Sequence, residues 1–451
     1  MKERSAWAWV ALVALLHGLC WHALLPAWQG EDEPWHYEFA ELVSRGHLPS
    51  GGGDVRAEDF ERNPQALCEI LRRFPTVERA EAAELQRDIA ASMDRARWTE
   101  RVDFAPRIAA PSSYDGYAPG YNAANQPPLA YLLTGAWIAM LGGPTPEARL
   151  ARARVLSLVW FIGTCIAIYA AARAWLELEA SALAAGLSAA LLPAHARAAA
   201  CVTNDTLAVL LGALACLCVA RVATSARPRT WFAVLLAVVA AGAATKTTTA
   251  IWLLAPAVAG AFMPAAARGA RVTWIALGLG ASAALGALAF GLWASHHSPA
   301  LPASLDAAAG RLERGLGGAS WLDLGSTLVG RTGWNTRGFP RAVELTLLAS
   351  ILVLAVGFVR TLPWRENRAP ALFCAVAVAA QVLLVASRGV GSARYLMPAL
   401  APMCVLVALA LRGWPGGTRV TTRLWVGALA GYAVLFGVWV LWSGQWLVVS
   451  S

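Results

Sequence analysis

Residues 6–25 read AWAWVALVALLHGLCWHALL, and residues 30–37 read GEDEPWHY. The first stretch is apolar over the ~20 residues that a helix needs to cross a bilayer. The charged MKER at residues 1–4 precedes it as in a signal sequence, but no small-x-small cleavage site follows. We therefore expect an uncleaved anchor with a cytoplasmic N-terminus. The second stretch places three carboxylates at the membrane boundary, where they either face water or take part in chemistry.

The apolar pattern of the first stretch recurs along the whole chain. Of its 451 residues, 58% are hydrophobic and only 14% are charged, and the mean hydropathy is +0.51. This balance excludes an ordinary soluble domain. It predicts an all-α polytopic membrane protein with about eleven transmembrane helices. The candidate spans are residues 6–25, 155–172, 180–200, 206–222, 230–245, 247–264, 272–294, 342–359, 369–386, 395–411 and 424–442.

The net charge of +9 would suggest a nucleic-acid partner for a soluble protein. Here the arginines cluster in short gaps between apolar stretches, as the positive-inside rule requires, so we expect no nucleic acid. Residues 127–143 decide the topology. If they do not cross, most arginine-containing gaps fall in the cytoplasm, and we predict that this stretch lies along or re-enters the outer interface. Arg149, Arg152 and Arg154 then lie outside, against the rule.

This topology divides the chain into five parts. They are a first transmembrane anchor at 1–25, an external loop with the carboxylates and the interfacial helix at 26–154, a transmembrane bundle at 155–294, a second external loop at 295–341, and C-terminal transmembrane helices at 342–451. In the first loop, apolar residues recur at helical spacing over 54–102, which predicts a solvated amphipathic helical pair. Tyr114, Tyr117 and Tyr121 follow as either an interface anchor or a sugar-stacking surface.

Polar residues gather at the ends of the spans that this topology turns outward: Asp32, Glu33, His36, Asn125, Gln126, Asn204, Asp205, Lys246, Arg394 and Tyr395. A carboxylate at such a surface can act as a general base toward a hydroxyl. Arginine and lysine nearby can hold a phosphate leaving group. The set therefore predicts a site for a lipid-borne phosphate at the membrane surface.

Several of these residues also have a purely structural interpretation. Asn204 or Asp205 can cap the following helix, since both residue types are favoured N-caps. Lys246 can be a snorkelling anchor, and Arg394 an interfacial one. His36 with two acids in one turn would bind a metal only with a further ligand from elsewhere. We therefore assign no metal ligands and leave a divalent cation open as a cofactor. The cysteines have neither metal nor disulfide spacing.

Six stretches resemble a known superfamily, the GT-C glycosyltransferases. GEDEPWHYEFAELVSRGHLP resembles their first external loop, where an Asp-Glu pair follows the first span. NQPPLAYLLTGAWIAMLGG resembles the "PPL" interfacial helix of the protein O-mannosyltransferase and aminoarabinose transferase group. The remaining matches are Arg154-Val155-Leu156-Ser157, ALLPAHARAAACVTNDTLAVLL, ATKTTTAIWLL and SARYLMPALAP. Their order and approximate spacing cover most of the chain.

The resemblance implies a GT-C fold and transfer of a sugar from a polyprenyl-phosphate carrier to an extracytoplasmic acceptor, in the lipid of a bacterial inner membrane. Asp32 would be the catalytic base, Glu33 its orienting or metal-facing partner and Asp205 the acid of the second loop. Arg394 and Lys246 would contact the carrier phosphate. The further substrate contacts would come from His36, Gln126, Arg154 and Tyr395. Gln126 departs from the family, which often has His or Lys before the two prolines.

A transporter or flippase for a lipid or solute is the alternative from another class. Transporters place ionisable groups or broken helices near the membrane midplane and often contain inverted repeats. The predicted spans lack acidic residues at mid-depth, and the polar set lies at their outer ends. A non-catalytic scaffold would not need Asp32, Asp205 and Arg394 on one face. The sequence therefore favours the enzyme.

Overall fold

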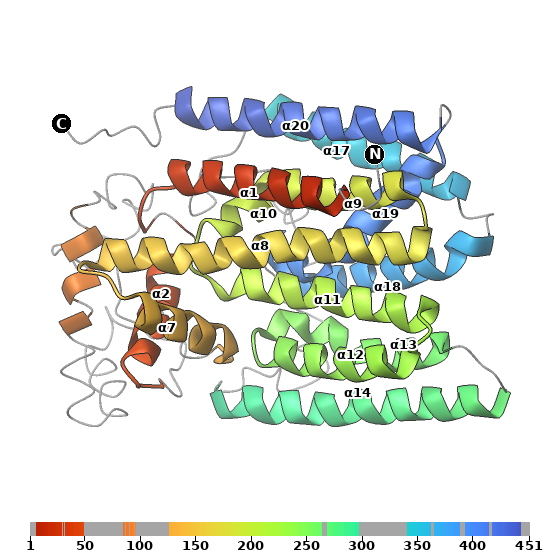
Figure 1. Cartoon of the computed structure of the whole chain (residues 1–451), viewed down its shortest axis with the longest axis horizontal. Coiled ribbons are helices and arrows are strands. Elements are labelled where there is room, and N and C mark those ends of the chain that lie inside the picture. Colours follow the sequence, from red (N-terminus) through yellow and green to blue (C-terminus); the bar gives the residue numbers. More distant parts are fainter. Residues whose placement is uncertain are drawn as a thin grey trace.

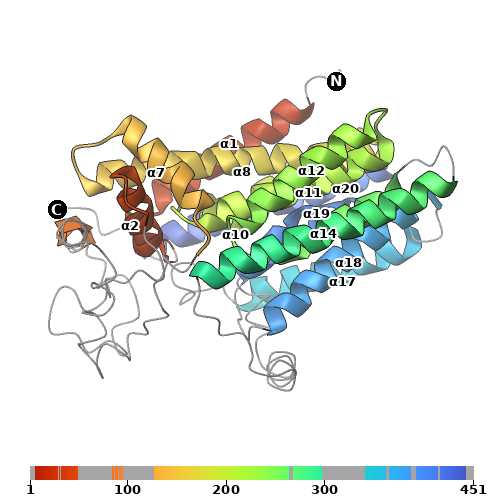
Figure 2. The same ribbon diagram turned by 90° about the horizontal axis from the view of Figure 1, so that it is seen from below.

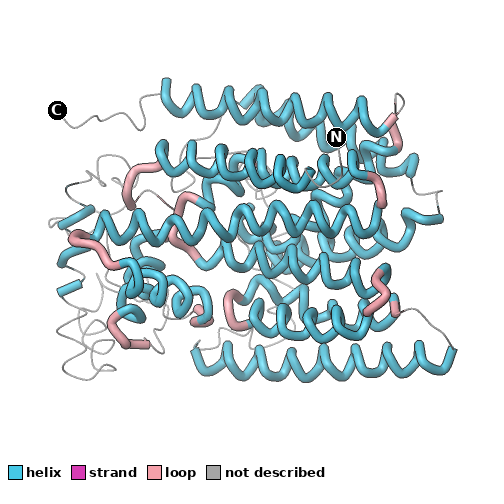
Figure 3. Tube along the Cα trace, in the orientation of Figure 1, coloured by secondary structure: helices cyan, strands magenta, loops and turns pink. Residues whose placement is uncertain are grey.

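The computed structural model describes residues 6–48 apart from 29 and 31, parts of 84–95, and residues 126–263, 268–296, 341–361, 365–387, 393–414 and 417–442. Tyr114, Tyr117, Tyr121, most of the predicted helical pair at 54–102 and the second external loop beyond His296 lie outside these residues. Within them, all regular secondary structure is helical, and short loops join the helices (Figure 3). The all-α prediction is confirmed.

Each of the eleven predicted spans coincides with a helix or a pair of helices. In the part of the chain that the structure describes, seven helices are long and apolar enough to cross a membrane. The helices are α1 (Ala6–Leu24), α8 (Pro146–Leu176), α9 (Glu179–Leu191) with α10 (Pro193–Ala199), α11 (Asn204–Thr224), α12 (Pro228–Ala243), η2 (Thr247–Leu254) with α13 (Ala255–Phe262), α14 (Arg268–His296), α17 (Arg341–Thr361), α18 (Arg365–Ser387), η3 (Ala393–Ala399) with α19 (Leu400–Arg412), and α20 (Thr418–Trp442).

The long helices form a bundle with a common axis (Figures 1 and 2). Helix α8 packs against α1, α9 and α11, and α19 packs against α9, α17 and α18. Helices α20 and α14 lie at opposite edges of the bundle in Figure 1. Helix α1 starts at one end of the bundle and α20 finishes at the other (Figure 1), as an odd number of crossings requires.

The third predicted span, residues 180–200, is not one helix. Helix α9 ends at Leu191, Leu192 has extended backbone angles (φ −71°, ψ 113°), and Pro193 starts the short helix α10. A proline disfavours the α conformation in the residue before it and removes a backbone donor, which explains the break. Because of it, the chain turns before Val202 and Thr203 at one end of the bundle.

Two helices outside the set of spans lie at that same end. Helix α2 (Glu33–Ser44) has Pro34 in its first turn and packs against α7 (Leu129–Leu141) (Figure 1). Gly135 permits this packing, since a Cβ there would lie 2.7 Å from the carbonyl oxygen of Ala40. The 13 residues of α7 extend over only ~20 Å, less than the ~30 Å hydrocarbon core. Its interfacial position remains a prediction.

A close contact brings the end of η3 against the middle of α11. At Gly212, a Cβ would clash with the carbonyl oxygen of Pro398, so only glycine allows this approach. Trp252 of η2 donates its indole N–H to the same carbonyl oxygen at 3.1 Å. The three segments α11, η2 and η3 are therefore held together, and Asp205, Lys246 and Arg394 lie at their starts.

Candidate active site

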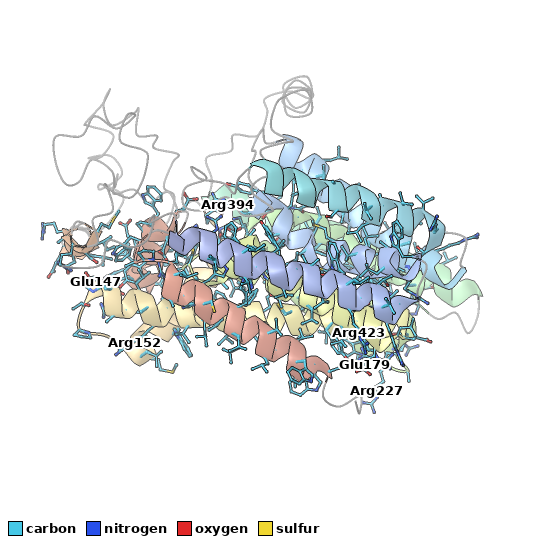
Figure 4. All side chains as sticks on the ribbon, turned by 90° about the horizontal axis from the view of Figure 1, so that it is seen from above. Glu147, Arg152, Glu179, Arg227, Arg394 and Arg423 are labelled. Carbon is cyan, nitrogen blue, oxygen red and sulfur yellow. The ribbon has the colours of Figure 1, made fainter. Side chains whose placement is uncertain are left out.

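The predicted site residues come from distant segments and gather at one end of the bundle. Figure 4 labels Arg394, Glu147 and Arg152 on the side of this end, and labels Arg227, Glu179 and Arg423 toward the opposite end. The two ends thus have separate groups of charges. The first end contains the starts of α2, α11, η2 and η3.

Asp32 and Arg394 form the more exposed ion pair of the site, with 2.5 Å between Asp32 Oδ2 and the Arg394 guanidinium. Asp32 is the N-cap of α2 and has a left-handed backbone (φ 56°, ψ 11°), which aspartate tolerates better than most residues. Its side chain makes no capping hydrogen bond within the described residues. Burial alone would raise the pKa of the Asp32 carboxyl, but Arg394 and His36 lower that pKa below its usual value. Asp32 is therefore ionised at neutral pH.

Asp205 and Lys246 form the second pair, with 2.5 Å between Lys246 Nζ and Asp205 Oδ1. Thr203 is the N-cap of α11, and its hydroxyl oxygen accepts the Asp205 backbone N–H at 3.1 Å. Neither Asn204 nor Asp205 therefore caps this helix. The Thr203 hydroxyl also donates to Asp205 Oδ2 at 3.0 Å. The Lys246 side chain is only 7% exposed, so it does not snorkel to the surface.

The Tyr395 ring connects the two pairs. Lys246 Nζ lies 5.2 Å from the ring centroid and Arg394 Cζ lies 4.9 Å from it, within cation–π range. Arg394 also donates to the Tyr395 hydroxyl oxygen at 2.9 Å. Both cations are thus held beside one aromatic side chain, and each faces a carboxylate. This arrangement places two positive charges side by side, each paired with a carboxylate.

His36 and Gln126 lie next to the two ion pairs. His36 is 6% exposed, and its Nδ1 lies 2.7 Å from the hydroxyl oxygen of Tyr131, whose ring stacks on it. Burial lowers the pKa of His36 to about 4, so the ring is neutral at pH 7. Asn204 donates its side-chain N–H to the Gln126 amide oxygen at 3.4 Å. No group of three or more His, Cys, Asp or Glu in the described residues is arranged to hold a metal ion.

Glu33 lies in a different environment from its neighbour Asp32. It is 0% exposed and receives two hydrogen bonds from Arg154, at 2.8 and 2.6 Å. The backbone N–H groups of Val202 and Gly30 donate to the same carboxylate at 2.9 and 3.3 Å. Four hydrogen bonds from Arg154, Val202 and Gly30 thus hold the Glu33 carboxylate, for which we predicted a role as catalytic partner of Asp32.

The Arg154 guanidinium also makes all of its described hydrogen bonds to protein groups, although we predicted a substrate contact for it. Besides Glu33, it donates to the carbonyl oxygens of Leu25 and Pro26, both at 2.8 Å. Its side chain is 6% exposed. Together, Glu33 and Arg154 join the end of α1, the start of α2, helix α8 and the segment before α11. We call this group of contacts the α2 anchor.

Some residues at this end were not among the predicted set. Glu41 of α2 is fully buried and pairs with Arg149 and Arg45, and Arg152 donates to the carbonyl oxygens of Leu141 and Gly142, both at 2.5 Å. Glu41 and Arg149 are 108 positions apart in the sequence, so no local signal indicates their pairing. Thr203 could have been found, since threonine before an apolar periodic stretch is a favoured N-cap.

Comparison with solved structures supports the fold. The crystal structure of ArnT from Cupriavidus metallidurans in the apo state matches with a TM-score of 0.51 at 16% sequence identity. The match covers 98% of this chain and 66% of ArnT, so the chain spans about two thirds of that protein's length. No curated protein matches the chain. The apolar helices and this likeness make it an integral membrane protein. A family model matches residues 15–412, and the chain therefore belongs to the family described as "Predicted membrane protein (DUF2142)".

Proposed function

We propose that this protein is a membrane glycosyltransferase that moves a sugar from a polyprenyl-phosphate carrier to an extracytoplasmic acceptor of the bacterial cell envelope. The observation that carries the proposal is the pairing of Asp32 with Arg394 and of Asp205 with Lys246 around Tyr395 at one end of the bundle. The site offers a base and two cations side by side. The fold likeness to ArnT and the GT-C sequence resemblance support the same assignment.

The electrostatics suit an anionic lipid headgroup. The two carboxylates neutralise Arg394 and Lys246. A carrier phosphate would replace the carboxylates as the partner of these cations. It would bind them through charge-assisted hydrogen bonds, which are stronger than hydrogen bonds between neutral groups. This exchange would release Asp32 from Arg394. Because Arg394 is a group that lowers the pKa of Asp32, loss of the pair makes the carboxylate a better base when the donor is bound.

The reaction would be a single displacement. The acceptor hydroxyl gives its proton to Asp32 as its oxygen attacks the anomeric carbon. The bond from that carbon to the phosphate oxygen breaks, and the bonding electrons leave with the polyprenyl phosphate, whose charge Arg394 and Lys246 stabilise. One displacement inverts the anomeric centre. Glu33 and Arg154 would act as positioning residues, since the α2 anchor sets the start of α2 and with it Asp32.

The flippase alternative requires charged groups on a path through the bilayer. In the described spanning helices, every acidic residue lies within four residues of a helix end. The ion pairs described above lie at one end of the bundle instead. This distribution favours chemistry at a membrane surface over transport through the bundle.

The test is sugar transfer in reconstituted vesicles. A panel of radiolabelled polyprenyl-phosphate sugars would be supplied with acceptor lipids and polymers extracted from the producing cells. Wild type would be compared with Asp32→Asn and with Glu177→Gln, a matched loss of one carboxylate at the opposite end of α8. We expect Asp32→Asn to lose ~10²–10⁴ in rate and Glu177→Gln to retain the wild-type rate.

Two results would contradict the proposal. Full activity of Asp32→Asn would exclude Asp32 as the base. Vesicles that move the carrier lipid across the bilayer equally well in both proteins, without sugar transfer, would show a flippase.

A further inference from the structure

A large cavity lies at the end of the bundle opposite the candidate active site, between the starts of α9 and α20. Its volume is about 740 Å³, within the ~300–1,000 Å³ range of small-molecule sites. Glu179 and Leu183 line it from α9, and Arg419, Thr422 and Arg423 line it from α20. Figure 4 labels Glu179 and Arg423 toward this end. We call it the inner cavity, because the predicted topology places this end of the bundle in the cytoplasm.

Side-chain hydrogen bonds hold the two walls of the inner cavity together. The hydroxyl of Thr422 donates to the carbonyl oxygen of Ala180 at 3.4 Å, and the indole N–H of Trp425 donates to the hydroxyl oxygen of Ser188 at 2.8 Å. Both bonds join α20 to α9, and the two helices pack against each other. Contacts within the protein therefore set the spacing of the walls, and a preformed site binds without the cost of ordering its own groups.

The charged groups of the inner cavity are not paired with one another. Within the described residues, the side chains of Glu179, Arg419 and Arg423 make no hydrogen bond and no ion pair. Three other arginines at this end each lie over a tryptophan ring, 5.6–5.9 Å from its centroid: Arg221 over Trp231, Arg229 over Trp274 and Arg360 over Trp414. The positive-inside rule explains arginines at this end, but it does not explain an unpaired carboxylate in the same cavity.

This arrangement suits a ligand that carries both charges. Arg419 and Arg423 are four residues apart on α20, so they are neighbours on one face of the helix. Guanidinium groups bind phosphate through paired N–H donors, and the two arginines together fit a phosphodiester. A primary ammonium group has three N–H donors and fits the Glu179 carboxylate on the other wall. A purely anionic ligand would leave Glu179 without a donor and in the same cavity as a like charge.

The surroundings of the inner cavity are those of a lipid site. Leu178 and Leu183 contribute apolar lining, and Val420 and Leu424, which follow the two arginines on α20, are 51% and 70% exposed. Helix α20 lies at an edge of the bundle (Figure 1), and only 22% of its apolar span is buried within the protein. Basic pockets between membrane helices on the cytoplasmic side bind lipid headgroups in other proteins.

We propose that the inner cavity binds the headgroup of phosphatidylethanolamine from the inner leaflet. The phosphodiester pairs with Arg419 and Arg423, the primary ammonium donates to Glu179, and the acyl chains extend along the outer face of α20. The lipid thus bridges α9 and α20. This site shares no residue with the candidate active site, so the inference does not rest on the proposed function.

The test is titration of delipidated, full-length protein in detergent with single lipids, followed by native mass spectrometry. Phosphatidylethanolamine is compared with phosphatidylcholine and phosphatidylglycerol of identical acyl chains. Phosphatidylcholine keeps the positive charge but has no N–H to donate, and phosphatidylglycerol has no positive charge. Because each lacks the charge-assisted hydrogen bond to Glu179, we expect phosphatidylethanolamine to bind at least ~5-fold more tightly than either.

Three variants locate the binding. Glu179→Gln should reduce the preference for phosphatidylethanolamine over phosphatidylglycerol to less than ~2-fold, because the ammonium loses its anionic partner. Arg419→Gln with Arg423→Gln should weaken the binding of all three lipids by ~10-fold or more. Arg227→Gln removes an exposed arginine at the same end but outside the lining, and should bind the lipids as wild type does. Size-exclusion profiles verify that each variant is folded.

Three results would overturn the inference. Tighter binding of phosphatidylglycerol than of phosphatidylethanolamine would make the inner cavity a site for anionic lipid. Equal affinities for the three lipids, or wild-type affinities in the double arginine variant, would show only general contact with membrane lipid. Competition by glycerophosphoethanolamine, which has no acyl chains, at the same concentration as the lipid would show a soluble ligand. Each of these results leaves the glycosyltransferase proposal untouched.

Discussion

Asp32 and Glu33 are adjacent in the sequence but belong to two different regions of the molecule. Glu33 lies in the α2 anchor, 0% exposed, with four hydrogen bonds from Arg154 and two backbone amides. Asp32 belongs to the group formed by Asp32, Arg394, Asp205, Lys246 and Tyr395, which we call the ion-pair cluster. Its side chain is 33% exposed, and that of its partner Arg394 is 22% exposed. Because protein groups occupy the acceptor positions of the Glu33 carboxylate, we propose that Glu33 has a structural role. We propose that Asp32, whose ion pair is partly exposed, exchanges its partner and takes part in the chemistry.

Asp205 and Lys246 belong to the ion-pair cluster by their position but resemble the anchor in burial, at 6% and 7% exposed. Their link to the more exposed pair is Tyr395, which both cations approach. The difference between the two regions therefore lies in the partners and not in burial alone. Four predictions test this distinction.

The largest expected effect is a loss of folding stability when the α2 anchor is disrupted. Glu33→Ala leaves the Arg154 guanidinium buried without its carboxylate, and loss of one partner of a buried ion pair costs about 3–5 kcal/mol. We expect the free energy of unfolding of the detergent-solubilised protein to fall by that amount in a denaturant titration. Glu177→Ala, an exposed carboxylate at the other end of α8, is the control. If the Glu33→Ala protein were as stable as wild type but inactive, Glu33 would be a catalytic residue of the ion-pair cluster and not part of the α2 anchor.

The next effect concerns pH, through His36 between the two regions. Its pKa is about 4 in the folded protein against an ordinary value near 6.5, so between these values the unfolded chain binds a proton that the folded chain does not. The free energy of unfolding should therefore decrease as the pH falls from about 6.5 to 4, by up to ~3 kcal/mol. His36→Gln should remove this part of the slope. Identical slopes in both proteins would show that His36 is not buried as a neutral ring.

A smaller effect is expected on donor binding, in the cluster. Lys246→Met removes one cation from the proposed phosphate site, and a hydrogen bond to a charged group contributes ~1.5–3 kcal/mol, or ~10–100-fold in KM for the donor. Lys246→Arg retains the charge and should lie between wild type and Lys246→Met. Lys246→Met alone leaves Asp205 buried without its cation, which lowers stability. The double variant Lys246→Met with Asp205→Asn removes both charges and so separates the effect on donor binding from the effect on stability. An unchanged KM in both would exclude a phosphate contact at Lys246.

The two regions also differ in how far the sequence alone could predict them. Hydropathy predicted the positions of the spans. Because every second crossing brings the chain back to the same membrane surface, we expected the polar residues at the outer ends of the spans to lie close together. The structure brings Asp32, Asp205, Lys246 and Arg394 together in this way. Residue type and position carried that information without any knowledge of packing.

The anchor could not be predicted in the same way. Its contacts use the backbone carbonyls of Leu25 and Pro26 and the amide of Val202, and any residue type supplies these groups. The break at Pro193 was visible in principle, but the largely apolar composition of 180–200 outweighed it. Arg154, which counted against the predicted topology, is explained by its buried partners.

The smallest expected effect is the sharpest test of the comparison. Asp32→Asn keeps the left-handed backbone of the N-cap, which asparagine also tolerates, and removes only the charge that faces Arg394. Because that pair is partly exposed, its loss should change the free energy of unfolding by no more than ~1 kcal/mol. The same denaturant titration that detects Glu33→Ala measures it. A protein that is almost inactive but nearly as stable as wild type places Asp32 among the reacting groups, whereas a loss of stability as large as that of Glu33→Ala would make Asp32 part of the anchor and leave the site without its base.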